Sequence, residues 1–215
     1  MVVVALQLSM INDFAYGTRW LAPIVEIALL VPLMALTLRA EVVARGARTT
    51  EQWDAATSYR QLNRLLGLAL VVVVSAANGR SLLLLLRALL AGRPRDGRAL
   101  LLDAMNIWIT NVIVFSLWYW QLDRGGASIG PTDHAGASEF IFPTMTLPPG
   151  TETVEPRVKL GYVDYLFLSF NTSTAFSPTD TMPLTARMKL LMMLEACVSL
   201  LTLALVAARA VNILA

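Results

Sequence analysis

The sequence predicts an all-α membrane protein with four transmembrane helices and one shorter, re-entrant helix. Of its 215 residues, 56% are hydrophobic, and the mean hydropathy of +0.62 is far above that of soluble proteins. Four apolar stretches are long enough to cross the roughly 30 Å hydrocarbon core of a bilayer, and a fifth is too short. We therefore expect a multi-pass protein of the cell membrane, surrounded by the lipid bilayer.

Residues 1–100 are expected to form an N-terminal membrane region with two transmembrane segments. The first, 20–38, has Glu26 as its only charged residue. The second, 65–90, is interrupted by Asn78-Gly79-Arg80, which allows either one long tilted helix or a re-entrant hairpin. Because no proline or multi-residue turn signal accompanies Gly79, we favour the single helix.

Residues 101–215 are expected to form a second unit. Its segments are an outer helix at 104–122, an extracellular loop at 123–160, a short helix at 162–174, a filter-like loop at 175–185 and a last helix at 190–214. The outer helix has no charged residue and ends in Trp118-Tyr119-Trp120, aromatics that are typical of a headgroup boundary. The extracellular loop is rich in Gly, Pro, Thr and acidic residues, so little regular structure is expected there. The short helix has too few residues to span the bilayer, which favours a re-entrant helix protected by protein.

Polar residues follow this short helix closely. Non-helical backbone at membrane depth is tolerated only where it lines water or is buried in protein, because an unpaired amide in lipid costs several kcal/mol. The hydroxyl-rich segment that begins at Thr174 is therefore not expected to face lipid. The carbonyl end of the short helix would also carry a partial negative charge that favours cations. The alternative is an ordinary extracellular turn between two helices.

The segment Ser169–Thr185, SFNTSTAFSPTDTMPLT, resembles the pore loop of potassium channels, with the pattern S-F-x-T-x-T-T-V-G-Y-G-D-x-x-P-x-T. From Tyr165 to Asn212, about a quarter of the chain, the sequence is similar to the pore helix, filter and inner helix of prokaryotic two-helix potassium channels. The last helix, ARMKLLMMLEACVSLLTLALVAARAVNIL, resembles their inner helices. This resemblance implies a homotetramer with the loop at its axis. The segments LWYWQLDRGG and AFSPTDTMPLT also resemble a group of uncharacterised bacterial membrane proteins, which implies no function.

The filter itself departs from the potassium-channel pattern. In that family, glycines let successive carbonyls point inward and replace the hydration shell of the ion. Here Phe176-Ser177-Pro178-Thr179 replaces V-G-Y-G, and Pro178 restricts both its own φ and the residue before it. The row of carbonyls therefore cannot form, and a shorter or wider constriction is expected. Its candidate residues are Thr174, Ala175, Phe176, Ser177, Pro178, Thr179 and Asp180.

The oxygen-only surroundings of such a constriction suit hydrated K⁺ and Na⁺. Four copies of Asp180, with Thr179 beside them, would bring carboxylates and other oxygens near one axis, which suits Ca²⁺. Alternatively, each Asp180 accepts hydrogen bonds from its own neighbours and points away from the axis.

Two charged residues within the apolar segments are functional-site candidates. The potassium-channel family has a glutamate behind the filter, so the resemblance implies that Glu195 supports the pore helix; a direct ion site is the alternative. Arg80 needs an acidic partner, and the sequence leaves both Glu26 and Glu195 open.

The arginines bear on the orientation in the membrane. If the filter-like loop faces outward, the loop with Arg39, Arg45, Arg48, Arg60 and Arg64 is also outside, in tension with the positive-inside rule. Arg87, Arg93, Arg95 and Arg98 would lie inside. We follow the resemblance and expect both termini in the cytoplasm. A re-entrant second segment would instead place both arginine groups inside.

The extracellular loop carries five acidic residues against three basic ones. The acids are Asp123, Asp133, Glu139, Glu152 and Glu155, and the bases are Arg124, Arg157 and Lys159. They form either an acidic vestibule that concentrates cations or a merely solvated loop.

The function expected from these features is a tetrameric cation channel that discriminates poorly between K⁺ and Na⁺ and is modulated or blocked by Ca²⁺. The alternative is a non-conducting structural or sensory membrane protein that keeps the pore-domain fold. An enzyme is not expected, because no His, Cys or paired-carboxylate motif supplies a catalytic group. The net charge of +2 is too small to indicate nucleic acid. Apart from K⁺, Na⁺ or Ca²⁺ in the pore, no cofactor is expected.

Overall fold

The computed structural model describes residues 50–90, 97–124, 138–143, 160–174 and 180–214. These residues form helices α3 (Thr50–Leu90), α4 (Gly97–Arg124), α5 (Tyr162–Thr174) and α6 (Ala186–Leu214), and strands β1 (Phe140–Ile141) and β2 (Met182–Pro183). The described part of the chain is thus mostly helical. The expected first crossing, 20–38, lies outside the described residues.

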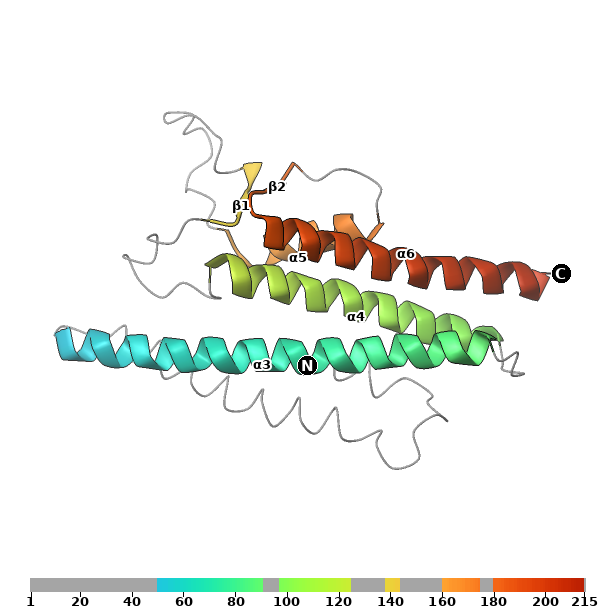
Figure 1. Ribbon diagram of the computed structural model, residues 1–215, viewed down its shortest axis with the longest axis horizontal. Helices are drawn as coiled ribbons and strands as arrows, with labels where there is room; N and C mark the ends of the chain where they lie inside the picture. Colours follow the sequence, from blue (N-terminus) through green and yellow to red (C-terminus); the bar gives the residue numbers. More distant parts are fainter. Residues whose placement is uncertain (1–49, 91–96, 125–137, 144–159, 175–179, 215) are drawn as a thin grey trace, which may run out of the picture.

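Within those ranges, three helical segments are long and apolar enough to cross a membrane. They are Arg64–Leu90 of α3, Leu100–Asp123 of α4 and Ala186–Leu205 of α6. α4 packs against all three of the other helices and lies between α3 on one side and α5 and α6 on the other (Figure 1). The C-terminal ends of α3 and α6 lie at the same end of the bundle as the start of α4 (Figure 1).

The second expected crossing is one continuous helix, as predicted. α3 runs without a break through Asn78-Gly79-Arg80 and extends by 14 residues on the N-terminal side of its apolar part, from Thr50 to Asn63. α5 has the bounds expected for the short helix, whereas α4 and α6 begin earlier than expected, at Gly97 and Ala186.

Little regular structure was expected in the loop after α4, and the described part of this loop contains a strand of two residues, Phe140–Ile141. This strand, β1, pairs in antiparallel register with β2, Phe140 opposite Pro183 and Ile141 opposite Met182. β2 lies in the filter-like loop, so two segments that are far apart in the sequence meet at one end of the bundle (Figure 1). The short strand was missed because two residues carry no periodicity that a sequence pattern can detect.

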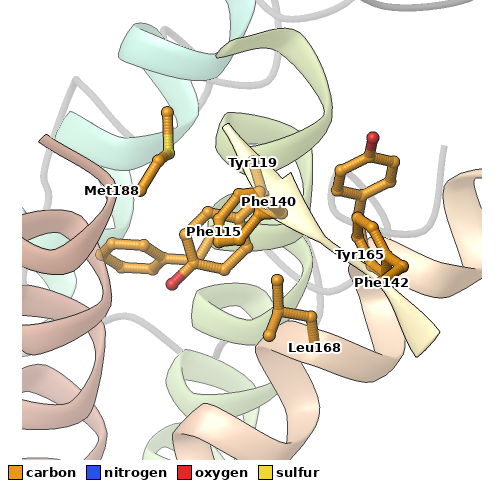
Figure 2. Packing of buried hydrophobic residues seen from close by; sticks show 7 residues of the cluster. All are labelled: Phe115, Tyr119, Phe140, Phe142, Tyr165, Leu168 and Met188. Atoms are coloured by element: carbon orange, nitrogen blue, oxygen red, sulfur yellow. The ribbon is translucent and has the colours of Figure 1, made fainter. Parts of the chain in front are cut away.

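An aromatic cluster joins the helices at that end (Figure 2). Its buried members are Phe115 and Tyr119 on α4, Phe140 and Phe142 at β1, Tyr165 and Leu168 on α5, and Met188 on α6. Tyr119 packs edge-on against Phe140 with 5.5 Å between ring centroids, and Phe142 does the same against Tyr165 at 5.2 Å. The cluster therefore seats β1 over α4 and α5.

Candidate functional site

The short helix α5 is held against α6 by one buried acid. Glu195 has no exposed surface and projects from α6 toward α5 and α4. Its Oε1 accepts hydrogen bonds from the hydroxyls of Ser169 and Ser173, the latter at 2.8 Å, and its Oε2 accepts one from the Tyr119 hydroxyl. A single carboxyl group thus connects three helices within the bundle.

The spacing of the two serines explains how α5 presents both of them to Glu195. Residues four apart lie on the same face of a helix, so the hydroxyls of Ser169 and Ser173 point in one direction. The Ser169 hydroxyl also lies 2.7 Å from the backbone oxygen of Val112 on α4. A hydroxyl carries one proton, so it donates to one of these two acceptors at a time. Ser169 therefore lies where α4, α5 and α6 come together.

The beginning and end of α5 make further contacts with α4. The hydroxyl of Tyr162 lies 2.8 Å from that of Ser116, and its ring packs edge-on against Trp120. At the other end, Phe170 packs edge-on against Trp108, with ring centroids 5.9 Å apart. α5 is therefore fixed along its whole length, although it is too short to span a bilayer.

A second buried acid, Asp123, lies in the last turn of α4 and fixes β1. Its Oδ1 accepts hydrogen bonds from the backbone amides of Glu139 and Phe140 and from the Ser138 hydroxyl. The Ser138 hydroxyl oxygen lies 3.0 Å from this Oδ1. Its Oδ2 accepts one from the Tyr165 hydroxyl of α5 at 2.6 Å. Asp123 therefore links the end of α4 to both β1 and α5.

Glu139 continues this network from β1 to α6. Its carboxylate accepts hydrogen bonds from Thr185 and Arg187, and its backbone oxygen accepts one from the amide of Leu184 at 2.8 Å. Arg187 is largely exposed, whereas Glu139 is buried. The bonds attach β1 to the chain that leads from the filter-like loop into α6.

The positions of these acids exclude a lining role for two residues of the expected vestibule. Asp123 and Glu139 are each only 8% exposed, and their oxygens are taken by donors of the protein itself. They are neither surface residues of a solvated loop nor available to attract cations from water. Asp133, Glu152 and Glu155 lie outside the described residues.

The expected ion-pathway residues are described only at their two ends. The Thr174 hydroxyl, at the end of α5, donates to the backbone oxygen of Phe170 or Asn171, at 3.0 and 3.2 Å. Asp180 is exposed. Ala175, Phe176, Ser177, Pro178 and Thr179 lie outside the described residues.

Polar side chains in the last turn of α5 donate hydrogen bonds back to carbonyls about one turn earlier. Besides the Thr174 bond, the Thr172 hydroxyl donates to Leu168 O at 2.9 Å, and the Asn171 amide donates to Phe167 O at 2.9 Å. Each donor keeps its oxygen lone pairs, which are acceptors. This end of α5 therefore offers oxygen atoms and a partial negative charge, surroundings that suit a cation.

In the described part of a single chain, no group of three or more His, Cys, Asp or Glu side chains could hold a metal ion. The expected Ca²⁺ ligands, Asp180 and Thr179, would have to come together from several copies. Such an arrangement stays a prediction.

Arg80 does not pair with Glu195, because the Glu195 oxygens are bonded to Tyr119, Ser169 and Ser173. Arg80 is exposed on α3. Its other expected partner, Glu26, lies outside the described residues.

Reasoning from the sequence singled out Glu195 but not the residues bonded to it. The serines could have been found, since Ser169 and Ser173 lie four residues apart and so share one face of the short helix. Tyr119 was assigned to a headgroup boundary, and its bond to Glu195 has no signal in the sequence. Asp123 and Glu139 were assigned to a loop because the hydrogen bonds that bury them also have no signal in the sequence.

Comparison with known proteins identifies no relative: no family model, no curated protein and no solved structure matches this chain.

Proposed function

We propose that the chain is the subunit of a homotetrameric cation channel of the cell membrane that discriminates poorly between K⁺ and Na⁺. In this proposal four helices cross the bilayer, α5 is a re-entrant pore helix, and both termini lie in the cytoplasm. The observation that carries it is the way α5 is held. A helix too short to span is braced by buried Glu195, and its carbonyl end leads into the hydroxyl-rich segment 175–179.

The polar segment also supports an assembly of several copies. Non-helical backbone at membrane depth requires protein or water around it, which one copy of a small bundle can hardly supply. Four copies around an axis would provide both. A monomer or dimer of native mass in mild detergent would contradict this assembly.

Ion flux from reconstituted liposomes tests conduction. We expect K⁺ and Na⁺ to permeate with similar ease, because Pro178 and the absence of glycines preclude closely spaced rings of carbonyls. Reversal potentials with K⁺ on one side and Na⁺ on the other measure the ratio. A strong preference for K⁺ would show that the interpretation of the filter is wrong.

Modulation or block by Ca²⁺ is part of the proposal, with Asp180 as the principal ligand. The exposure of Asp180 leaves its carboxylate accessible in a single chain. Flux measured against Ca²⁺ concentration, for the native protein and for Asp180→Asn, tests the assignment. An unchanged Ca²⁺ response in the variant would remove Asp180 from the site.

The second candidate is a non-conducting structural or sensory protein with the same fold, favoured by Phe176-Ser177-Pro178-Thr179 in place of a glycine-containing filter. Absence of flux for every cation tried, from a protein shown to be folded and tetrameric, would favour this candidate over the channel.

A further inference from the structure

The exposed arginine on α3 lies where a bare charge is costly. Arg80 belongs to the apolar segment Arg64–Leu90, and Arg87 follows it by seven residues, about 10 Å along a helix. If Arg87 lies at the headgroups, the guanidinium of Arg80 would have to cover that distance to reach water. A charged side chain inside a membrane normally faces protein or a water-filled cavity and has a partner.

Arg80 also lies on a continuous face of α3 that no other described element covers. One side of this helix, which includes Val71, Val74 and Leu82, is buried against α4. The opposite side is exposed along the apolar segment and consists of Leu65, Ala69, Val72, Ala76, Gly79, Arg80, Leu83, Arg87 and Leu90. A side chain at Gly79 would meet no atom within 4 Å. Small residues of this kind allow a second helix to approach closely.

The buried acids of the described helices are not available to Arg80. Glu195 is bonded to three hydroxyls on the α5 and α6 side of α4, and Asp123 is bonded to β1 and Tyr165. Asp103 is buried and has an interaction of its own. Among the remaining apolar stretches of the sequence, 20–38 carries one charge, and that charge is the acid Glu26.

The chain length and the depth of the two charges agree with a pairing between them. The 11 residues 39–49 join 20–38 to the start of α3 and include three arginines, which disfavour their entry into the hydrocarbon core, so a crossing segment 20–38 would have residue 38 on the same side of the membrane as the N-terminal end of α3. Glu26 precedes Leu38 by 12 residues, about 18 Å, and Arg80 follows Leu65 by 15 residues, about 22 Å. The two depths differ by less than one helical turn.

We infer that the segment 20–38 crosses the membrane antiparallel to α3 and covers its exposed face, with Glu26 paired to Arg80. In this arrangement 20–38 packs against α3 of its own subunit. The inference does not depend on whether the protein conducts ions. Charge complementarity selects the occupant, because lipid offers no acid at that depth and a neutral helix would leave Arg80 unpaired.

Charge reversal tests the pair in the full-length protein. Glu26→Arg and Arg80→Glu each leave two like charges together, and we expect each to lower the amount of folded, detergent-extracted protein by about tenfold. The double variant with both changes should recover to near the native amount. Glu26→Arg combined with Arg87→Glu is the matched control, since Arg87 lies on the same face two turns away, and no recovery is expected.

Disulfide cross-linking tests the docking without altering either charge. In a Cys197→Ala background, Leu30→Cys with Ala76→Cys places one cysteine a turn from each member of the pair, and mild oxidation should join them within one chain. Cleavage at a protease site introduced into 40–48 would then leave the two fragments joined until the disulfide is reduced. Ala28→Cys with Ala76→Cys is the control, because residue 28 faces away from Glu26 on a helix.

Recovery in the reversed pair together with the intrachain cross-link supports the inference. Failure of the double variant to recover, while the single variants are impaired, would overturn the ion pair. A cross-link between two chains would assign the face to a second copy, and equal cross-linking from residue 28 would exclude the proposed orientation. If the charge variants do not fold, the cysteine pairs still test whether 20–38 packs against α3, because those variants retain Glu26 and Arg80.

Discussion

The short helix α5 and the long helix α3 pack on different sides of α4, and they are held in different ways (Figure 1). α5 is held by side-chain hydrogen bonds to α4 and α6, through Glu195, Asp123 and Ser116. α3 is held mainly by apolar packing, with Leu70, Val71 and Val74 against Val114 of α4. One side-chain hydrogen bond between α3 and α4 accompanies this packing, from Trp118 to Ser75 at 2.9 Å.

This difference agrees with the proposal that α3 crosses the bilayer and that α5 is re-entrant. The bilayer itself fixes the depth of a helix that spans the hydrocarbon core, so packing needs only to determine which helices lie beside it. A helix of 13 residues cannot be positioned in this way, and its polar end must be kept away from lipid. In the proposed arrangement, directional bonds to buried side chains supply this constraint on α5.

The strongest test of this contrast is removal of the acid that α5 depends on. Glu195→Ala leaves the hydroxyls of Ser173 and Tyr119 without their acceptor, whereas Ser169 can still donate to the Val112 oxygen, so we expect a loss of about 2–4 kcal/mol in the free energy of unfolding in micelles. Labelling of a cysteine introduced at Phe167 should also change in rate, because α5 is released.

The neighbouring residue provides the control for this loss. Leu194 is 55% exposed on the same helix, and Leu194→Ala should change stability by less than about 1 kcal/mol. Glu195→Gln keeps one acceptor oxygen, so its loss of stability should lie between those of Glu195→Ala and Leu194→Ala. An equal effect of the Leu194 and Glu195 variants would mean that the buried bonds contribute little to holding α5.

A smaller loss of stability is expected on removal of Asp123, the acid that is hydrogen-bonded to both α5 and β1. Asp123→Ala removes the acceptor of the Glu139 and Phe140 amides, and a loss of about 2 kcal/mol is expected. Hydrogen exchange at these two amides should accelerate, since they would no longer be bonded. Asp164→Ala is the control: Asp164 accepts one bond, from the Gly161 amide near the surface, and its loss should cost about 1 kcal/mol or less. Unchanged exchange at Glu139 and Phe140 would contradict the role of Asp123.

The smallest effect is expected at the packed side of α3. Gly67 lies so close to α4 that an added Cβ would collide with the side-chain amide of Gln121. We expect Gly67→Ala to cost about 1 kcal/mol, because the end of the glutamine side chain can move. The double variant with Gln121→Ala should regain stability, and the accessibility of α5 should stay unchanged. If Gln121→Ala gave no recovery, the close approach at Gly67 would not be the cause.

The long apolar helices were the part of the fold most accessible to prediction from sequence. α3 is one helix across Asn78-Gly79-Arg80, as the absence of proline indicated, and α5 has the predicted bounds. The start of α4 was misplaced because the helix extends past its apolar part, and the start of α6 because its first turn contains Arg187 and Lys189; hydropathy alone does not mark where a helix continues past such residues. The homotetramer, the ion pathway and the orientation remain predictions.

Composition and the length of its apolar segments were sufficient to determine that the chain forms helices long and apolar enough to cross a membrane, because a bilayer leaves few other ways to satisfy the backbone. The sequence also marked Glu195 as a buried acid of structural or functional importance, since a charge in an apolar helix is costly. Only the tertiary structure decided which hydroxyls it meets, and that Asp123 and Glu139 are buried anchors of β1 rather than acids of an open loop. Those contacts join residues between 15 and 76 positions apart, and a hydrogen bond over such a separation depends on how helices pack, which no local pattern records.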